Sequence, residues 1–452
     1  MSLAATSTSI LKRDIFLYAT KIFTSAIIAR KLGPEMLGVY MILMLIPSYA
    51  ESFGRLKFDI AAVYFLGKQK YRMSEMVVTL NLLALVTSGL IVGIILWQFD
   101  WIYTLLFSKT KYDVSALLQF VLLQIPLHFL WMNYSYLIIH KEDVDAYNKM
   151  IIIQALVPSL LAVILLLTTD LGLWAVAGST LLSTLLSLIF GFVRLGSTGP
   201  AGRLVNLPLI RDLFRYGSKL YVGGLVGHFQ AYVTNLLTAL YLVPEQVAFF
   251  SMARGFGQMM DRVPAALNTI LFPRLTKTVD PIEAANLSAR AFRLILVLLV
   301  MVGLIAAVLI YPAVRLMYGR DFLPLVVPFL ILIPGIILSG ATTPFMQYFM
   351  SVNRADLGVT LPILPLAVQV SLAFLLIPIW GVNGAAMAFS VGLVTFSVAS
   401  IWMFVRLSAC SLQTDLMVRG DDLRYLLQFT KVEIEKIWKT RKLKPAKASH
   451  AD

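Results

Sequence analysis

The sequence predicts an all-α integral membrane protein with about twelve transmembrane helices, arranged as two six-helix repeats around a central cavity. Of the 452 residues, 59% are hydrophobic and only 14% are charged, with a mean hydropathy of +0.82. A soluble protein needs far more charge to cover its surface. The apolar stretches also recur at about 20 residues, the length that crosses a bilayer. Lipid offers the backbone no hydrogen-bond partners, so such stretches must be helical.

Two sets of six apolar stretches follow one another along the chain. They lie at about 14–32, 35–65, 75–98, 114–139, 148–168 and 173–194, and then at 213–242, 245–274, 287–311, 322–350, 358–378 and 383–406. We therefore expect an N-terminal half at 1–203, a C-terminal half at 204–406 and a basic tail at 407–452. Spacing of apolar residues between 423 and 438 predicts an amphipathic helix on the inner leaflet, with a solvated helix as the alternative.

A short sequence near the start of the second stretch returns in the eighth. LGPEMLGVY begins at Leu32 and LVPEQVAFF begins at Leu242, so the offset is 210 residues. At nearly the same spacing, LGLWAVAG from Leu171 is similar to IWGVNGAA from Ile379. Two matches at one spacing favour an internal duplication over chance reuse of Gly-Pro turns. Halves with an even number of helices share one orientation, as in transporters built from parallel repeats.

The distribution of lysine and arginine predicts the orientation of the chain. With both termini inside, 26 of the 38 basic residues fall in cytoplasmic segments and 6 fall in the outer loops. Such an asymmetry is typical of cytoplasmic loops. The net charge of +14 is therefore a membrane feature, and it does not indicate nucleic-acid binding.

Ionisable residues inside the predicted spans are concentrated in the first two helices of each half. Charges at membrane depth are costly, so they usually face a cavity or a partner. The 210-residue offset pairs Glu51 with Asp261, and a separate local match pairs Lys21 with Lys219. The candidate cavity residues are Lys21, Glu51, Arg55, Lys219, Arg254, Gln258, Asp261 and Arg262. If these helices line one cleft, the cleft is net cationic and suits an anionic group such as a phosphate.

A structural interpretation of the same charges stays open. Glu51 and Arg55 are four residues apart and could neutralise one another on one helix face, as could Arg254 and Asp261. Lys57, Asp59 and Lys219 could lie near the inner interface and extend to water. The isolated His128 and His228 are interpreted as packing residues rather than as proton carriers.

Several classes of function find no support in the sequence. There is no Gly-rich nucleotide-binding loop or dinucleotide fingerprint. Four histidines and one cysteine are too few and too separated for a metal cluster, so we expect neither metal nor cofactor. The outer loops are short, which argues against an enzyme acting on that face.

Three segments resemble the oligosaccharide flippase family of Wzx-type polysaccharide exporters, in the superfamily that includes the MATE drug transporters and the lipid II flippases. The first is IIARKLGPEMLGVY, from Ile27 to Tyr40. The second runs from Val243 to Lys277, where Ala248 and Phe250 replace the usual Gly and Tyr. The third is GVNGAAMAFSVG, from Gly381 to Gly392.

This resemblance implies a flippase that moves a polyprenyl-pyrophosphate-linked oligosaccharide across the cytoplasmic membrane by alternating access. It implies membrane lipid and the lipid-linked glycan as partners, with a polymerase and glycosyltransferases nearby and no nucleic acid. Lipid II flippases carry two further helices, which argues against that branch. One alternative is a cation-coupled drug exporter of the same fold, which would need a net-acidic cavity to bind organic cations. Another is a non-transporting membrane scaffold for polysaccharide assembly.

Overall fold

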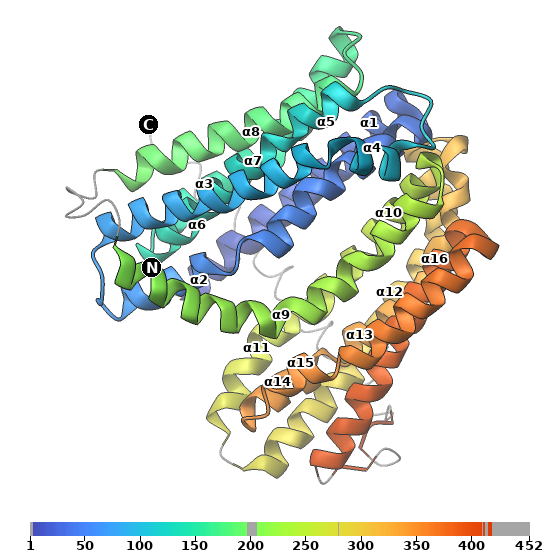
Figure 1. The fold of residues 1–452 in the computed structure, drawn as a ribbon. Helices are drawn as coiled ribbons and strands as arrows, with labels where there is room; N and C mark the ends of the chain where they lie inside the picture. The colour runs from blue at the N-terminus through green and yellow to red at the C-terminus, as the bar shows by residue number, and fades with distance from the viewer. Residues whose placement is uncertain (1–2, 197–205, 279, 409, 412–414, 418–452) are drawn as a thin grey trace, which may run out of the picture. The chain divides into compact units, whose positions relative to one another are not determined.

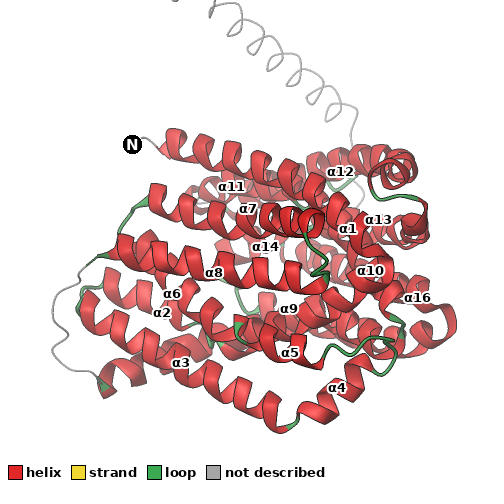
Figure 2. Ribbon diagram, turned by 90° about the horizontal axis from the view of Figure 1, so that it is seen from above, coloured by secondary structure: helices red, strands yellow, loops and turns green. Residues whose placement is uncertain are grey.

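The computed structural model describes residues 3–196, 206–278, 280–408, 410–411 and 415–417. Throughout these residues the regular structure is helical, with no strand (Figure 2). The predicted helix at 423–438 lies outside the described residues. Figure 1 traces the elements, which are α1 (Leu3–Gly54), α2 (Phe58–Gly67), α3 (Met73–Trp97), α4 (Phe99–Phe107), α5 (Ser115–Leu122), α6 (Gln124–His140), α7 (Val144–Thr168), α8 (Leu173–Leu195), α9 (Leu207–Tyr241), α10 (Pro244–Met260), α11 (Arg262–Lys277), α12 (Pro281–Met317), η1 (Arg320–Leu325), α13 (Val326–Ala341), α14 (Thr343–Ser351), α15 (Leu357–Thr360) and α16 (Ile363–Leu407).

The predicted spans all fall on helices, which confirms the fold class. Eight helical stretches in the described residues are long and apolar enough to cross a membrane. Two of them, Thr20–Gly54 and Leu357–Leu407, each overlap two predicted spans. The predicted spans outside this set, 213–242 and 245–274, are the charged first two helices of the second half. The chain is thus a multi-pass membrane protein.

Glycine separates the two helices within α1 and within α16. Gly33 has φ 72° and ψ 170°, and Gly381 has φ 56° and ψ −131°. Side-chain-bearing residues rarely adopt these conformations, so glycine permits the kink. The kinks fall where the sequence predicts short connections, between 32 and 35 and between 378 and 383.

The described residues form two compact units. The first contains residues 3–255, 309–332 and 362–389. Within it α7 packs on α8, α6 packs on α8 and α3 packs on α6 (Figure 1). Tightly packed apolar side chains such as Met76, Leu137 and Met150 form its core between these helices.

The second unit contains residues 256–308, 333–361 and the described part of 390–417. Its core includes a run of aromatic rings, with Phe345 stacked between Phe292 and Phe404 at centroid distances of 5.0 and 4.1 Å. The start of the tail packs on α12 of the same unit, where the buried Arg293 donates a hydrogen bond to the Asp415 carbonyl.

The two copies of the repeated Pro-Glu sequence meet in the first unit. A Cβ atom added to Gly38 would overlap the Pro244 carbonyl, so this close approach of two helix starts requires glycine at position 38. The predicted duplication stays a prediction. The division at 203/204 stays a prediction.

Candidate functional site

The second predicted span is interrupted at the level of its charged residues. Helix α1 ends at Gly54 and α2 begins at Phe58. Between them Leu56 and Lys57 have φ values of 50° and 56°. Left-handed conformations are uncommon for residues with side chains and usually need surrounding structure to hold them. This segment, Arg55–Lys57, is called the first break below.

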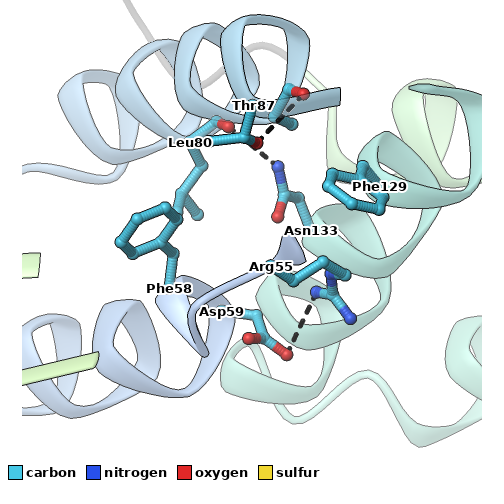
Figure 3. Close-up of a pocket in the computed structure, with 8 residues that line it drawn as sticks. Arg55, Phe58, Asp59, Leu80, Thr87, Phe129 and Asn133 are labelled. Atoms are coloured by element: carbon cyan, nitrogen blue, oxygen red, sulfur yellow. Dashed lines mark hydrogen bonds and ion pairs between the residues drawn. The ribbon is translucent and has the colours of Figure 1, made fainter. Parts of the chain in front are cut away.

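An ion pair spans the first break. Arg55 Nη2 lies 3.2 Å from Asp59 Oδ2, and the two side chains are only 11% and 3% exposed. The Arg55 guanidinium also lies 6.0 Å from the centre of the Phe129 ring (Figure 3). Of the structural alternatives left open by the sequence, Arg55 is thus neutralised by Asp59 and not by Glu51, and Asp59 is buried and does not extend to water. The pair follows the same four-residue spacing, one turn further along.

Glu51 is held by a residue on another helix. His128 Nδ1 of α6 lies 3.6 Å from Glu51 Oε2, and the histidine ring packs edge-on against Trp131. His128 is thus not isolated, contrary to the sequence interpretation. The Glu51 side chain stays one-third exposed, so it remains accessible as a candidate cavity residue.

Helix α9 packs closely against the first break. A Cβ atom at Gly217 would lie 2.5 Å from the Leu56 carbonyl oxygen. The Tyr221 hydroxyl donates to the Phe53 carbonyl over 3.0 Å, which satisfies one of the carbonyls released where α1 ends. The glycine and the tyrosine thus let α9 approach the break and cap it.

An aromatic cluster continues from the break along α9. It consists of Tyr49, Phe53, Phe229 and Tyr232. The Phe53 and Phe229 rings are 4.8 Å apart, and the Tyr49 and Tyr232 rings are 5.4 Å apart. The Tyr49 hydroxyl donates to the Tyr232 carbonyl over 2.5 Å. Aromatic rings with polar edges in a spanning region offer flat surfaces that an amphipathic ligand can contact.

Arg254 of α10 lies in a polar and aromatic setting. Its Nη1 atom donates to Asn235 Oδ1 of α9 over 2.9 Å. The guanidinium carbon lies 4.8 Å from the centre of the Phe389 ring, within the range of a cation–π interaction. Asn235 is one turn from Tyr232, so α9 contacts both Arg254 and the aromatic cluster. Arginine held in this way can still offer donors to a phosphate.

The remaining candidates are exposed in the structure. Lys21 and Lys219 lie in the first unit, and Gln258, Asp261 and Arg262 lie in the second. The structure thus brings Glu51, Arg55, Lys21, Lys219 and Arg254 into one unit. A common cavity lined by all eight residues stays a prediction.

Sequence reasoning missed the neutral polar side chains that hold the helices of the first unit together. Gln124 and Gln154 both donate to Thr184 Oγ1, over 2.7 and 3.0 Å. Gln369 donates to Thr234 Oγ1 over 2.8 Å. Amide–hydroxyl hydrogen bonds of this kind join helices in membranes. Their signal in the sequence is a lone amide in an apolar run, which is weaker than a charge.

The fold is that of known membrane transporters. The lipid II flippase MurJ in an inward closed conformation superposes with a TM-score of 0.70 at 14% identity, over 96% of this chain and 99% of that chain. An inward-facing MATE family multidrug resistance transporter superposes with a TM-score of 0.68 at 16% identity, over 86% of this chain and 95% of that chain.

Sequence comparison places the chain in a narrower group of proteins than the fold does. A family model described as polysaccharide biosynthesis protein matches residues 27–327, and the chain belongs to that family. A putative O-antigen transporter of Shigella flexneri is 20% identical over 390 residues, which cover 84% of this chain and 92% of that protein. These matches confirm the resemblance that the sequence motifs predict.

Proposed function

We propose that this chain is a flippase that moves a polyprenyl-pyrophosphate-linked oligosaccharide across the cytoplasmic membrane, for the synthesis of a cell-surface polysaccharide. Membership of the polysaccharide biosynthesis family is the observation that carries this proposal. It is supported by the fold, which is shared with a protein named as a lipid II flippase. In this proposal both termini lie in the cytoplasm, as the distribution of basic residues predicts.

The charged helices suit the pyrophosphate of such a substrate. Arg254, Lys21 and Lys219 supply cationic groups in a chain whose other spans carry few charges. Arginine presents several donors to phosphate oxygens in a fixed plane. We assign the pyrophosphate to Arg254, because Asn235 and Phe389 already hold its guanidinium in place. The aromatic cluster supplies surfaces for the glycan.

Transport by the purified chain in liposomes tests this proposal. The liposomes carry a fluorescent oligosaccharide linked through pyrophosphate to a polyprenyl lipid, and an added glycosidase reports the glycan on the opposite leaflet. We expect translocation by the native chain. We expect Arg254→Gln to slow it about tenfold or more, because hydrogen bonds to charged groups contribute about 1.5–3 kcal/mol. Arg254→Lys should retain part of the rate.

A matched control separates the site from general damage. Arg354 lies outside the predicted spans and pairs with Asp356 over 3.0 Å, with both side chains largely exposed. Arg354→Gln should translocate at the native rate. Equal translocation rates for Arg254→Gln and the native chain would show that Arg254 does not bind the pyrophosphate. An inactive native chain would contradict the flippase assignment itself.

A second candidate is a cation-coupled exporter of small molecules, which the similarity to a MATE transporter favours. It predicts uptake of organic cations driven by an ion gradient, measured in the same liposomes. A third candidate is a scaffold for a polymerase and glycosyltransferases. Removal of residues 407–452 should abolish the function of a scaffold and leave that of a flippase largely intact.

A further inference from the structure

A small cavity lies beside the first break, inside the first unit. Its volume is about 10 Å³. Four of its lining residues are polar, namely Arg55, Asp59, Thr87 and Asn133. They come from the first break, from α2, from α3 and from α6, so the cavity joins the interrupted helix to two neighbours (Figure 3).

One polar atom beside this cavity has no hydrogen-bond partner among the residues that the structure describes. Asp59 Oδ2 pairs with Arg55, but Oδ1 is buried and accepts no hydrogen bond. The Tyr136 hydroxyl of α6 is close enough to interact with this carboxylate, but it makes no hydrogen bond of good geometry with Oδ1. A buried carboxylate oxygen without a donor costs free energy, and buried polar groups are normally satisfied by protein or by water.

The charges and the size of the cavity select the ligand. A metal cation bound to Oδ1 would face the Arg55 guanidinium, which already lies 3.2 Å from the other oxygen of the same carboxylate. An anion would be repelled by Asp59. A neutral donor fits both charges, and about 10–15 Å³ holds one water molecule. Thr87 and Asn133 line the same cavity, so they are the further polar partners for a water there, and buried waters need two to four such partners.

We propose that this cavity is a binding site for a single water molecule, which donates to Asp59 Oδ1 and bridges the ion pair of the first break to α3 and α6. The water completes the hydrogen bonding of Asp59 and so stabilises the left-handed segment at Leu56 and Lys57. This site does not depend on what the protein transports.

Hydroxyl-radical footprinting of the full chain in nanodiscs tests the site. Radicals produced from an ordered water oxidise the side chains that touch it, even when these are buried. Phe58 and Phe129 line the cavity and are 5% and 2% exposed, whereas Phe292 and Phe329 are equally buried, at 5% and 2%, and do not line it. We expect Phe58 and Phe129 to be oxidised several-fold faster than the other two. Equal protection of all four rings would overturn the proposal.

Two variants on α3 show whether the polar lining holds the water. Thr87→Val keeps the shape and removes a lining hydroxyl, so the oxidation of Phe58 and Phe129 should fall. Ser88→Ala is the control, because Ser88 is fully buried on the same helix and does not line the cavity. Oxidation that is unchanged in Thr87→Val would contradict the bridge to α3.

The same preparation distinguishes water from a cation. Addition of Na⁺ or K⁺ at constant ionic strength should leave both the oxidation rates and the unfolding temperature unchanged. A rise in unfolding temperature that Asp59→Asn abolishes would show that a cation occupies the site, and it would overturn the proposal.

Discussion

The second span of each half is interrupted, and the two interruptions have different causes. In the C-terminal half α10 ends at Met260 and α11 begins at Arg262, with Pro264 in the first turn of the new helix. Proline lacks an amide donor and its ring conflicts with the carbonyl four residues earlier. In the N-terminal half the chain has no proline between Pro47 and Pro126. There the interruption consists of two left-handed residues, an ion pair across them and a glycine on α9.

Proline explains other interruptions in the same way. Leu123 separates α5 from α6 and precedes Pro126, and Thr342 separates α13 from α14 and precedes Pro344. Proline is well tolerated in the first turn, where the amide would have no partner. A proline-made break is thus a local property of the sequence, whereas the first break depends on tertiary contacts.

Loss of Asp59 should give the largest effect, because it leaves the Arg55 charge buried without its partner. We expect Asp59→Ala to cost about 3–5 kcal/mol of unfolding free energy, measured by denaturation in detergent micelles. The double variant Arg55→Met/Asp59→Leu should recover most of this loss. Asp261→Ala, in the other interruption, should cost less than about 1 kcal/mol, because Asp261 is exposed and interactions of exposed charges contribute little. Similar losses for Asp59→Ala and Asp261→Ala would remove the distinction between the two interruptions.

A side chain at Gly217 should damage the first break from the α9 side. The added Cβ of Gly217→Ala meets the Leu56 carbonyl at 2.5 Å, and overpacking of this kind costs about 1–3 kcal/mol. Gly227→Ala is the matched control, because no atom lies within 4 Å of its added Cβ. The control should be neutral or slightly stabilising in the same unfolding measurement. A neutral Gly217→Ala would mean that α9 does not hold the break.

Removal of the proline should repair the second interruption. Pro264→Ala restores an amide donor for the Met260 carbonyl, four residues earlier, and removes the ring conflict with that carbonyl. We expect slower hydrogen exchange of the amides from 261 to 266, with a stability change within about 1 kcal/mol. Unchanged exchange would show that proline is not the cause of this interruption.

A helix cap away from both interruptions should give the smallest effect. Asp143 accepts a hydrogen bond from the Ala146 amide at the start of α7, and this bond, with help from Arg194, lowers the pKa of the Asp143 carboxyl. Because the pKa is lower in the folded state, the stabilisation is present at neutral pH and is lost as the pH falls through the folded value. Asp143→Ala should cost about 1 kcal/mol at neutral pH.

Acid titration of the same variant checks the sign of this effect. The difference in unfolding free energy between the native chain and Asp143→Ala should shrink in acid, below the usual aspartate pKa of about 3.9. A difference that grows in acid would contradict the assigned shift.

The fold could be predicted from the sequence because the lipid environment allows few structures. Span length and the Gly33 connection depend on local patterns, and the structure agrees with both. The 210-residue repeat is also a local pattern, and the duplication that it predicts stays a prediction. Charged residues could be found in the same way, since each is conspicuous in an apolar helix. Their partners could not, because Glu51 meets His128 through the packing of α6, and Asn235 meets Arg254 through the packing of α9. The first break escaped prediction for the same reason.

Arg55 and Arg254 are both arginines within predicted spans, but the structure gives them different surroundings. Arg55 forms a buried ion pair with Asp59, whereas Arg254 is held by Asn235 and Phe389 and is the arginine that we assign to the pyrophosphate. Translocation of the lipid-linked oligosaccharide in liposomes by two folded variants tests this difference most directly. The account predicts that Arg55→Met/Asp59→Leu, which replaces the buried pair by apolar side chains, keeps most of the native rate, while Arg254→Gln loses about tenfold or more. A double variant that stops transport while Arg254→Gln retains it would contradict the account.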